Sequence, residues 1–281
     1  MKKIIFFVLL IGLSFSSFAQ DEEEGPKEGW SKTGNISLLF NQSSFSNWVA
    51  GGKNNISGTL GVNYDFNYLK GDITWDNKII IAYGLTKLKG EDQQKTDDRL
   101  DINSVLGKKA KGYWYYSLFF NAKTQMDVGY NPDTGIEVSH GFSPLYLQFG
   151  PGMLWKKNDN LKVNIAPATA RLIIVDDHFT AFGESFGIEQ GETTRFEFGI
   201  AIGAYYKLNL MKNISMENIL NLYTNYLEDP QNVDLDYTMN LVMKVNDYIS
   251  ANLSFQTIYD DNAYQGFQTR EVFGLGVSYG F

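Results

Sequence analysis

From Trp30 to the end of the chain, apolar and polar residues alternate with a period of two. Successive side chains of a β-strand point to opposite faces, so this period predicts strands with one apolar and one polar face. In the segment 55–68, for example, Val62 and Tyr64 share one face, whereas Asn63 and Asp65 share the other. The same pattern predicts about twelve strands. They lie near residues 34–42, 54–69, 73–88, 98–109, 113–127, 144–156, 160–175, 193–208, 213–227, 233–246, 248–260 and 268–281.

The connections between these segments alternate in length. Tight turns are expected near 70–72, 110–112 and 157–160, and longer loops near 43–53, 128–143 and 176–192. An even number of strands with short and long connections at opposite ends is typical of outer-membrane barrels. The sequence therefore predicts an all-β fold, a transmembrane antiparallel up-and-down β-barrel over residues 31–281, with both termini on the periplasmic side. A soluble, lipocalin-like barrel with its apolar face inside is the alternative, because periodicity does not say which face is inside.

Aromatic residues support the membrane interpretation. Several fall on the apolar face beside the short turns, where an interfacial girdle would lie, namely Tyr68, Trp75, Trp114, Trp155 and Tyr206. The chain ends on Phe281, after a strand that alternates aromatic or aliphatic residues with Gly and Ser. This ending resembles the C-terminal signal that the outer-membrane barrel insertion machinery recognises.

The N-terminus reads as an export signal. Lys2 and Lys3 precede an apolar run over residues 4–13, and small residues lead to Ala19. This order predicts a signal peptide over residues 1–19, followed by an acidic periplasmic linker over residues 20–30. The apolar run is too short for a spanning helix, so we do not expect this segment to anchor the chain in a membrane. The export signal and the predicted barrel together predict a cell outer membrane location.

Composition excludes several classes of function. The chain has no cysteine, so it has neither disulfides nor thiolate chemistry. Its formal charge of −8 becomes about −10 without Lys2 and Lys3, and no basic stripe is present. A nucleic-acid partner is therefore not expected. The sequence predicts no cofactor and no metal site.

A motif near the mature N-terminus suggests a family. Asn47, Trp48, Gly51 and Gly52 form an N-W-x-x-G-G pattern. It resembles the signature of a Bacteroidota family of outer-membrane β-barrels that is classed only as a domain of unknown function. The resemblance implies an architecture and a location over residues 30–281 and no chemistry. Within a barrel, the segment is either a gate loop at the mouth or a loop whose Trp packs on the rim.

The polar faces of the strands supply candidate lumen residues. In a barrel of about twelve strands, large side chains either line a narrow channel or brace it shut. Asp76 and Lys78 lie on the strand beside Arg99 and Asp101, so they are candidate cross-strand partners. The candidate lumen-lining residues are Asp76, Lys78, Arg99, Asp101, Lys123, Arg195, Glu197, Asp234, Asp236 and Lys244.

Few residues offer catalytic chemistry. His140 and His178 are the two histidines, and both fall in predicted outer loops. Asp176 and Asp177 next to His178 resemble half of an aspartyl protease site, and Ser139 precedes His140. The sequence fixes no further geometry for either arrangement, so no catalytic residue is predicted.

Two functions remain open. The first is a narrow, porin-like channel or transporter for small polar or charged solutes, with lumen charges setting selectivity. The alternative is a closed accessory or structural barrel within a larger outer-membrane assembly. Expected partners are outer-membrane lipid, the barrel insertion machinery during biogenesis and other outer-membrane proteins.

Overall fold

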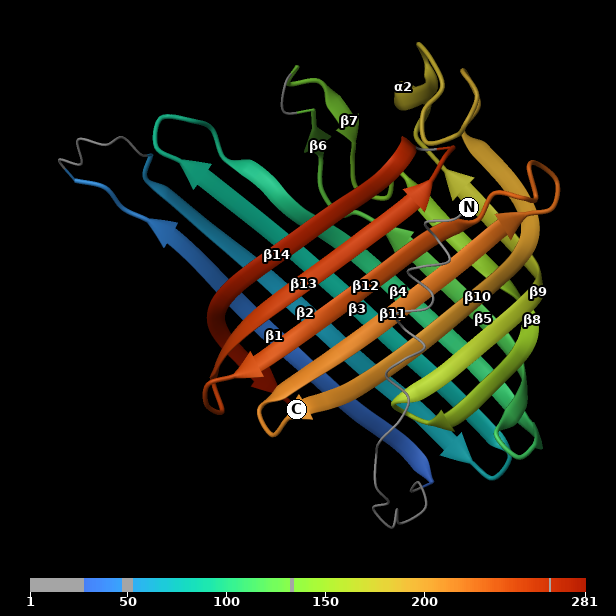
Figure 1. Cartoon of the computed structure of the whole chain (residues 1–281). Coiled ribbons are helices and arrows are strands. Elements are labelled where there is room, and N and C mark those ends of the chain that lie inside the picture. The colour runs from blue at the N-terminus through green and yellow to red at the C-terminus, as the bar shows by residue number, and fades with distance from the viewer. Residues whose placement is uncertain (1–27, 47–52, 132–133, 263) are drawn as a thin grey trace.

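The described part of the chain forms one closed barrel. The computed structural model describes residues 28–46, 53–131, 134–262 and 264–281. Within these ranges, twelve antiparallel strands follow one another around the ring in chain order, and β14 closes on β1 (Figure 1). The strands are β1 (Gly29–Ser43), β2 (Asn55–Lys70), β3 (Ile73–Leu88), β4 (Gln94–Lys111), β5 (Trp114–Thr124), β8 (Leu145–Asn158), β9 (Leu161–Ile174), β10 (Thr194–Met211), β11 (Ile214–Asn225), β12 (Asp234–Lys244), β13 (Ile249–Asp260) and β14 (Tyr264–Gly280).

The predicted fold class, an all-β transmembrane antiparallel up-and-down barrel, is confirmed. Two features were not predicted. A small hairpin of β6 (Gly129–Tyr130) and β7 (Glu137–Ser139) lies in the β5–β8 loop, and the one-turn helix α2 (Asp177–Thr180) lies in the β9–β10 loop. The strand β1 begins at Gly29, slightly before the predicted start of the barrel. The predicted signal peptide and most of the linker lie outside the described residues.

The two ends of the barrel differ. Tight turns such as those at Gly71 and Gly112 gather at one end, and both glycines have a positive φ that other residues rarely adopt. The longer connections gather at the other end, with α2 and the β6–β7 hairpin (Figure 1). We call these the short-turn end and the loop end. Gly29 and Gly280, where the described barrel begins and ends, both lie at the short-turn end.

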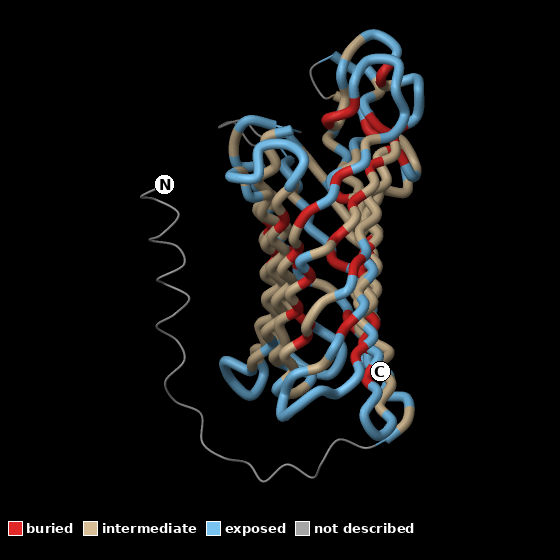
Figure 2. Tube along the Cα trace, turned by 90° about the vertical axis from the view of Figure 1, so that its right-hand side faces the viewer, coloured by how far each residue is buried: buried red, intermediate tan, exposed pale blue. Residues whose placement is uncertain are grey.

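The barrel places its apolar residues outside and its charges inside. Leu118, Phe273 and Leu275 face outward and are 54%, 57% and 54% exposed, whereas Asp101 and Glu197 face inward and are each 2% exposed. Buried positions lie scattered along the barrel rather than in one core (Figure 2). A water-soluble barrel needs the opposite arrangement, so the lipocalin-like alternative is wrong.

Within the described residues, no helix is long and apolar enough to cross a membrane.

Aromatic side chains gather at the short-turn end. The ring of Trp30 lies 5.2 Å from that of Tyr68 and 5.8 Å from that of Trp75. Farther around the barrel, Trp114 is the register partner of Trp155. An aromatic belt at this level matches the boundary between hydrocarbon and headgroups.

A bulge interrupts the alternation where β8 passes β9. Phe149 pairs with Ala170 and Met153 with Ile165, so residues 150–152 face residues 166–169. Pro167 lies in this bulge, where its missing N–H costs no ladder bond. The extra residue shifts the alternation of β9, so inward-facing residues have even numbers before the bulge and odd numbers after it. Ala166, before the bulge, and Arg171, after it, are therefore both buried.

The seam between the first and last strands is short. β1 pairs with β2 over its whole length, from Gly29 and Leu69 to Ser43 and Asn55. It pairs with β14 only from Asn35 and Gly280 to Phe40 and Leu275. Beyond this seam the two strands diverge toward the loop end (Figure 1).

Two glycines of β10 provide a matched test of packing. A Cβ at Gly199 would overlap the backbone oxygen of Thr224, whereas a Cβ at Gly203 would meet only the Asn221 side chain at 3.6 Å. We expect Gly199→Ala to lower the free energy of unfolding by about 1–3 kcal/mol and Gly203→Ala to change it little. Denaturant unfolding in detergent micelles, followed by tryptophan fluorescence, measures both. Equal effects of the two substitutions would contradict the packing described.

Candidate functional site

The barrel is flattened, so its opposite walls approach each other. It is broad in the view of Figure 1 and narrow in Figure 2, which is turned by 90°. The wall containing β2–β5 therefore faces the wall containing β10–β13. This shape brings single side chains from opposite strands within contact distance across the interior.

An ion pair bridges opposite strands near the short-turn end. Lys78 Nζ on β3 lies 2.8 Å from Glu217 Oε1 on β11 and 3.1 Å from Asp65 Oδ2 on β2. β3 and β11 stand directly opposite each other in the ring. Tyr205 donates a hydrogen bond of 2.8 Å to the same Glu217 oxygen. The lumen is therefore crossed at this level by charged side chains.

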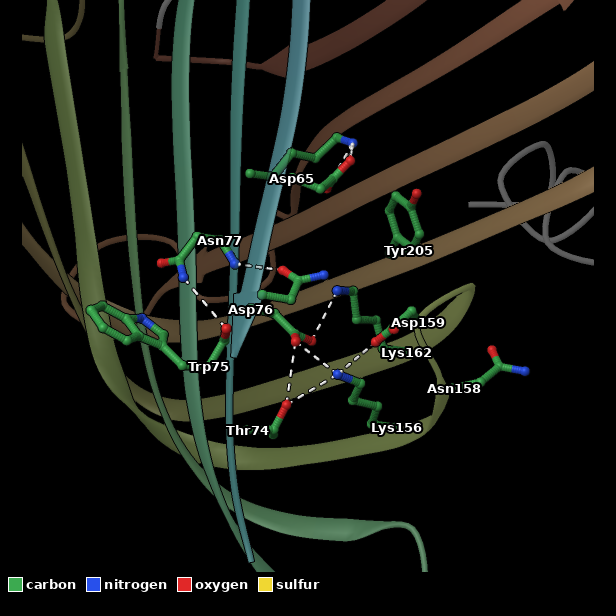
Figure 3. A network of polar contacts seen from close by, with 12 residues as sticks. Asp65, Thr74, Trp75, Asp76, Asn77, Lys156, Asn158, Asp159, Lys162 and Tyr205 are labelled. Carbon is green, nitrogen blue, oxygen red and sulfur yellow. Dashed lines mark hydrogen bonds and ion pairs between the residues drawn. The ribbon is translucent and has the colours of Figure 1, made fainter. Parts of the chain in front are cut away.

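A second group of contacts lies beside this bridge, around Asp76 on β3. Lys156 Nζ on β8 lies 2.7 Å from Asp76 Oδ1, and Lys162 Nζ on β9 lies 2.9 Å from Asp76 Oδ2 (Figure 3). Lys162 and Lys78 also lie 5.2 Å and 5.3 Å from the centre of the Tyr205 ring. We call these residues, with Asp65 and Glu217, the short-turn layer.

A middle layer crosses the lumen again. Arg99 on β4 binds Asp101 at 2.8 Å and donates to the Thr238 hydroxyl on β12, directly opposite, at 3.5 Å. Lys123 on β5 forms an ion pair with Asp236 on β12. The basic groups of this layer come from β4 and β5, and the acidic groups come from β4 and β12.

One further ion pair links the middle layer to the seam. Arg270 on β14 pairs with Asp97 on β4. β1, β2 and β3 lie between these two strands in the ring, so the pair crosses the barrel interior beside β1.

The third layer, at the loop end, centres on Arg171. This guanidinium lies 2.5 Å from Asp234, 3.2 Å from Asp260 and 3.5 Å from Glu197, and it stacks 5.0 Å from the centre of the Tyr223 ring. We call this the loop layer. The only group of possible metal ligands in the described part of the chain is Asp234, Asp260 and Asp261, with ligand atoms within 4.8 Å of one another. Arg171 already neutralises two of its members.

Arg195 extends the loop layer toward solvent. It lies 2.9 Å from Glu197 and 2.8 Å from Glu228. Glu197 therefore contacts two guanidinium groups.

The same cost of burying charges applies to all three layers. Each charge loses water on burial, and that loss is offset only when an opposite charge lies close and the remaining polar atoms are hydrogen-bonded. Removing one partner leaves the other charge buried and unpaired, which is the costly outcome. The ion pairs and hydrogen bonds of the interior therefore form networks that link opposite strands.

Three cavities lie in the interior. A cavity of about 130 Å³ lies beside the short-turn layer, next to Lys78 and Tyr205. Another of about 110 Å³ lies beside the seam, next to Leu39 and Ile80. A larger one of about 460 Å³ lies toward the loop end, between Lys123 and Arg270. We call the last the loop-end cavity.

Most of the predicted lumen residues lie in these layers. The residues Asp76, Lys78, Arg99, Asp101, Lys123, Arg195, Glu197, Asp234 and Asp236 all make the interior contacts described above. Lys244 differs, because it lies exposed at the short-turn end of β12. The expected pairing of Asp76 and Lys78 with Arg99 and Asp101 is wrong. The register sets Lys78 opposite Asn103 and Arg99 opposite Ala82.

Some lumen residues were missed by the sequence analysis. Arg171 was missed because the bulge at Pro167 changes which residues of β9 face inward. Pro167 itself was the sequence feature that could have indicated a bulge. Asp97 was assigned to a loop, but β4 begins three residues earlier, at Gln94. The possible gate residues Asn47, Trp48, Gly51 and Gly52 lie outside the described residues.

Among the described residues, the candidate catalytic groups do not come together as a complete catalytic site. Asp176 caps α2 by accepting from the His178 backbone N–H at 3.0 Å, and this bond holds the pKa of Asp176 below its usual range. His140 Nε2 lies 3.4 Å from Asp176 Oδ2. Asp97 and Asp98, a neighbouring pair of carboxylates that could complete an aspartyl protease site, have other partners, because Asp97 binds Arg270 and Asp98 binds Lys95.

The chain resembles known proteins only distantly. Residues 40–130 match a family described as a protein of unknown function, DUF3078. This supports the expectation of an uncharacterised family. No curated protein matches the chain.

Solved structures with a related barrel include three bacterial proteins. The COG4313 outer membrane channel from Pseudomonas putida F1 is 9% identical with a TM-score of 0.40, covering 94% of this chain and 99% of that one. The outer membrane channel DcaP of Acinetobacter baumannii is 9% identical with a TM-score of 0.34, covering 94% and 100%. The translocator domain of autotransporter NalP from Neisseria meningitidis is 9% identical with a TM-score of 0.32, covering 100% and 95%. Similarities of this size carry no inference about function.

The bridge between opposite walls can be tested by a double-mutant cycle. We expect Lys78→Met to lower the free energy of unfolding by about 3–5 kcal/mol, because it leaves Glu217 and Asp65 without their cation. Adding Glu217→Gln should recover part of this loss, giving a coupling energy of about 1 kcal/mol or more. Denaturant unfolding in micelles supplies the four values. Lys244→Met is the control, since its exposed side chain predicts a change within about 0.5 kcal/mol. Additive effects of the two interior substitutions would show that the bridge does not form.

Proposed function

We propose that this chain is an outer-membrane β-barrel whose lumen is closed to solutes, and that it serves as an accessory or structural barrel in a larger outer-membrane assembly. One observation carries the proposal. Charged side chains from directly opposite strands meet in the lumen, as Lys78 and Glu217 do at 2.8 Å. Ion pairs that cross the lumen suit a plugged barrel better than a continuous aqueous path.

The location follows from the distribution of polarity and turns. Lipid solvates the outward Phe, Leu and Val side chains, and a closed ring of strands leaves no unpaired backbone in hydrocarbon. Short turns at one end and long loops at the other support an orientation with the termini in the periplasm. Lipid is then the partner of the outer wall, and the insertion machinery would act on the strand that ends at Phe281.

A narrow channel for small polar or charged solutes is the second candidate. The loop-end cavity favours it, because the cavity carries Lys123, Arg270 and Asp236 on its walls and is larger than the spaces below. A solute could pass beyond it only if Arg99 and then the Lys78–Glu217 bridge moved aside. The channel function therefore requires a gate, whereas the accessory function requires none.

Planar-bilayer recording of the purified full chain separates these functions. We expect no steady unitary current from the native protein, because the layers obstruct ion flow. We expect unitary currents from a variant that combines Lys78→Ala, Glu217→Ala and Arg99→Ala, since these changes remove the contacts between the directly opposite strands β3 and β11 and between β4 and β12.

Steady unitary currents from the native protein in symmetric salt would sink the closed-lumen proposal and favour the channel. Heat-dependent migration on a gel verifies that each variant is a folded barrel. Lys244→Ala, at the exposed short-turn end, is the matched control and should stay electrically silent.

A further inference from the structure

The last strand has an edge that no neighbour covers. β14 begins at Tyr264 and pairs with β13 along almost its whole length. Its pairing with β1 starts only at Leu275. On the β1 side, the segment Tyr264–Gly274 therefore has no strand partner among the described residues.

The register shows which backbone groups face this open side. Gly34 and Phe281 exchange both of their backbone hydrogen bonds across the seam, at 2.7 Å and 3.0 Å. In an antiparallel pair such residues alternate with residues that bond the other neighbour. The even-numbered Ser278 bonds the other neighbour instead. Its backbone N–H donates to the carbonyl oxygen of Tyr248, in the turn before β13, at 2.7 Å. By this alternation, the N–H and C=O groups of the odd-numbered residues face the open side, which are Phe267, Thr269, Glu271 and Phe273.

The open edge starts where the apolar outer surface ends. Phe273 and Leu275 face outward and are more than half exposed, whereas the next outward residue toward the loop end is the charged Glu271. Beyond it, Phe267 is 59% exposed, and its ring centre lies 5.2 Å from that of Tyr259 with the two rings tilted by 47°. The edge thus combines a row of backbone donors and acceptors with one carboxylate between aromatic groups.

We propose that this edge of β14 binds an extended segment of another protein as an added strand. Such a segment would continue the sheet through main-chain hydrogen bonds. It would carry a basic residue beside Glu271, which has no ion pair among the described residues, and apolar residues beside Phe267 and Phe273. The proposal deepens the accessory function, on which it rests, by naming the surface and the chemistry of the partner.

Other occupants fit the edge less well. Two copies in one membrane are related by an axis along the membrane normal, so their tilted β14 strands would cross at roughly 80° and could not pair. The described chain begins at Glu28, which accepts from the Gly71 N–H at 2.8 Å and so lies at the opposite end of the barrel. A segment from a different protein meets neither obstacle.

The first experiment tests whether the edge is open. The native chain has no cysteine, so introduced pairs report cleanly. If the seam continued, Gln42 would lie opposite Phe273, within the Cα separation that a disulfide needs. We expect Gln42→Cys with Phe273→Cys to stay reduced under mild oxidation in proteoliposomes. Leu38→Cys with Val277→Cys, at paired positions, should cross-link readily. Equally fast cross-linking of both pairs would overturn the proposal.

The second experiment tests strand addition directly. The probe is a fluorescent nine-residue peptide in which threonine and valine alternate around a central lysine. Fluorescence anisotropy measures its binding to the full-length barrel in nanodiscs, and a proline-interrupted peptide is the negative control. We expect Thr269→Pro to weaken binding about tenfold by removing one N–H from the open side, without touching the β13 ladder. Thr269→Val keeps that N–H and should bind as the native protein does. Glu271→Gln should weaken binding severalfold.

The outcomes are separable from those of bilayer recording. A silent barrel that does not bind the peptide, or binds it equally after Thr269→Pro, overturns the edge proposal and leaves the closed lumen intact. A conducting barrel that binds the peptide overturns the closed lumen instead. A lipid occupant is a further outcome. In this test a dye is attached to the cysteine of Leu39→Cys. If brominated phospholipid quenches the dye while the peptide does not bind, lipid occupies the open side of the seam and the strand proposal fails.

Discussion

The structure depends on the closed ring of backbone hydrogen bonds. In hydrocarbon, no water replaces a missing partner, so each strand must be paired on both sides wherever lipid surrounds it. The strand pairing satisfies this condition around most of the ring and relaxes it at the junction of β1 and β14, where only Asn35–Phe40 and Leu275–Gly280 pair. Because the ring turns alternate side chains inward, every polar residue of the alternating pattern is forced into a shared interior. The charge network is therefore a consequence of closure and not an independent feature.

The flattened cross-section determines what that interior can do. Flattening brings opposite walls closer together than they would lie in a round barrel with the same number of strands. Here Lys78 and Glu217 meet directly, and Arg99 reaches Thr238. Ion pairs across the lumen let charges of both signs be buried. The same contacts place charged side chains across the lumen, which is why the shape and the proposed closed state belong together.

The sequence predicted the strands and their polarity well, because period-two alternation is a local property. It failed where structure depends on register. Arg171 was missed because a single bulge at Pro167 reverses the parity of β9, and Lys244 was included although its strand ends there. The sequence could not predict which residues pair across the lumen, because no local pattern relates Lys78 to Glu217. The seam was equally hidden, because the strands it joins are the first and last in the barrel.

The long sequence separation of the cross-lumen pairs has a consequence for how the barrel is assembled. Asp97 meets Arg270 only after nearly the whole chain has been arranged, and Lys78 waits for β11. A hairpin entering lipid alone would carry its carboxylates and ammonium groups without their counter-charges, at a large cost in solvation. Insertion strand by strand is therefore disfavoured. The chain has to gather into a nearly complete sheet while its inner face is still hydrated, and water leaves that face only as the last strands arrive.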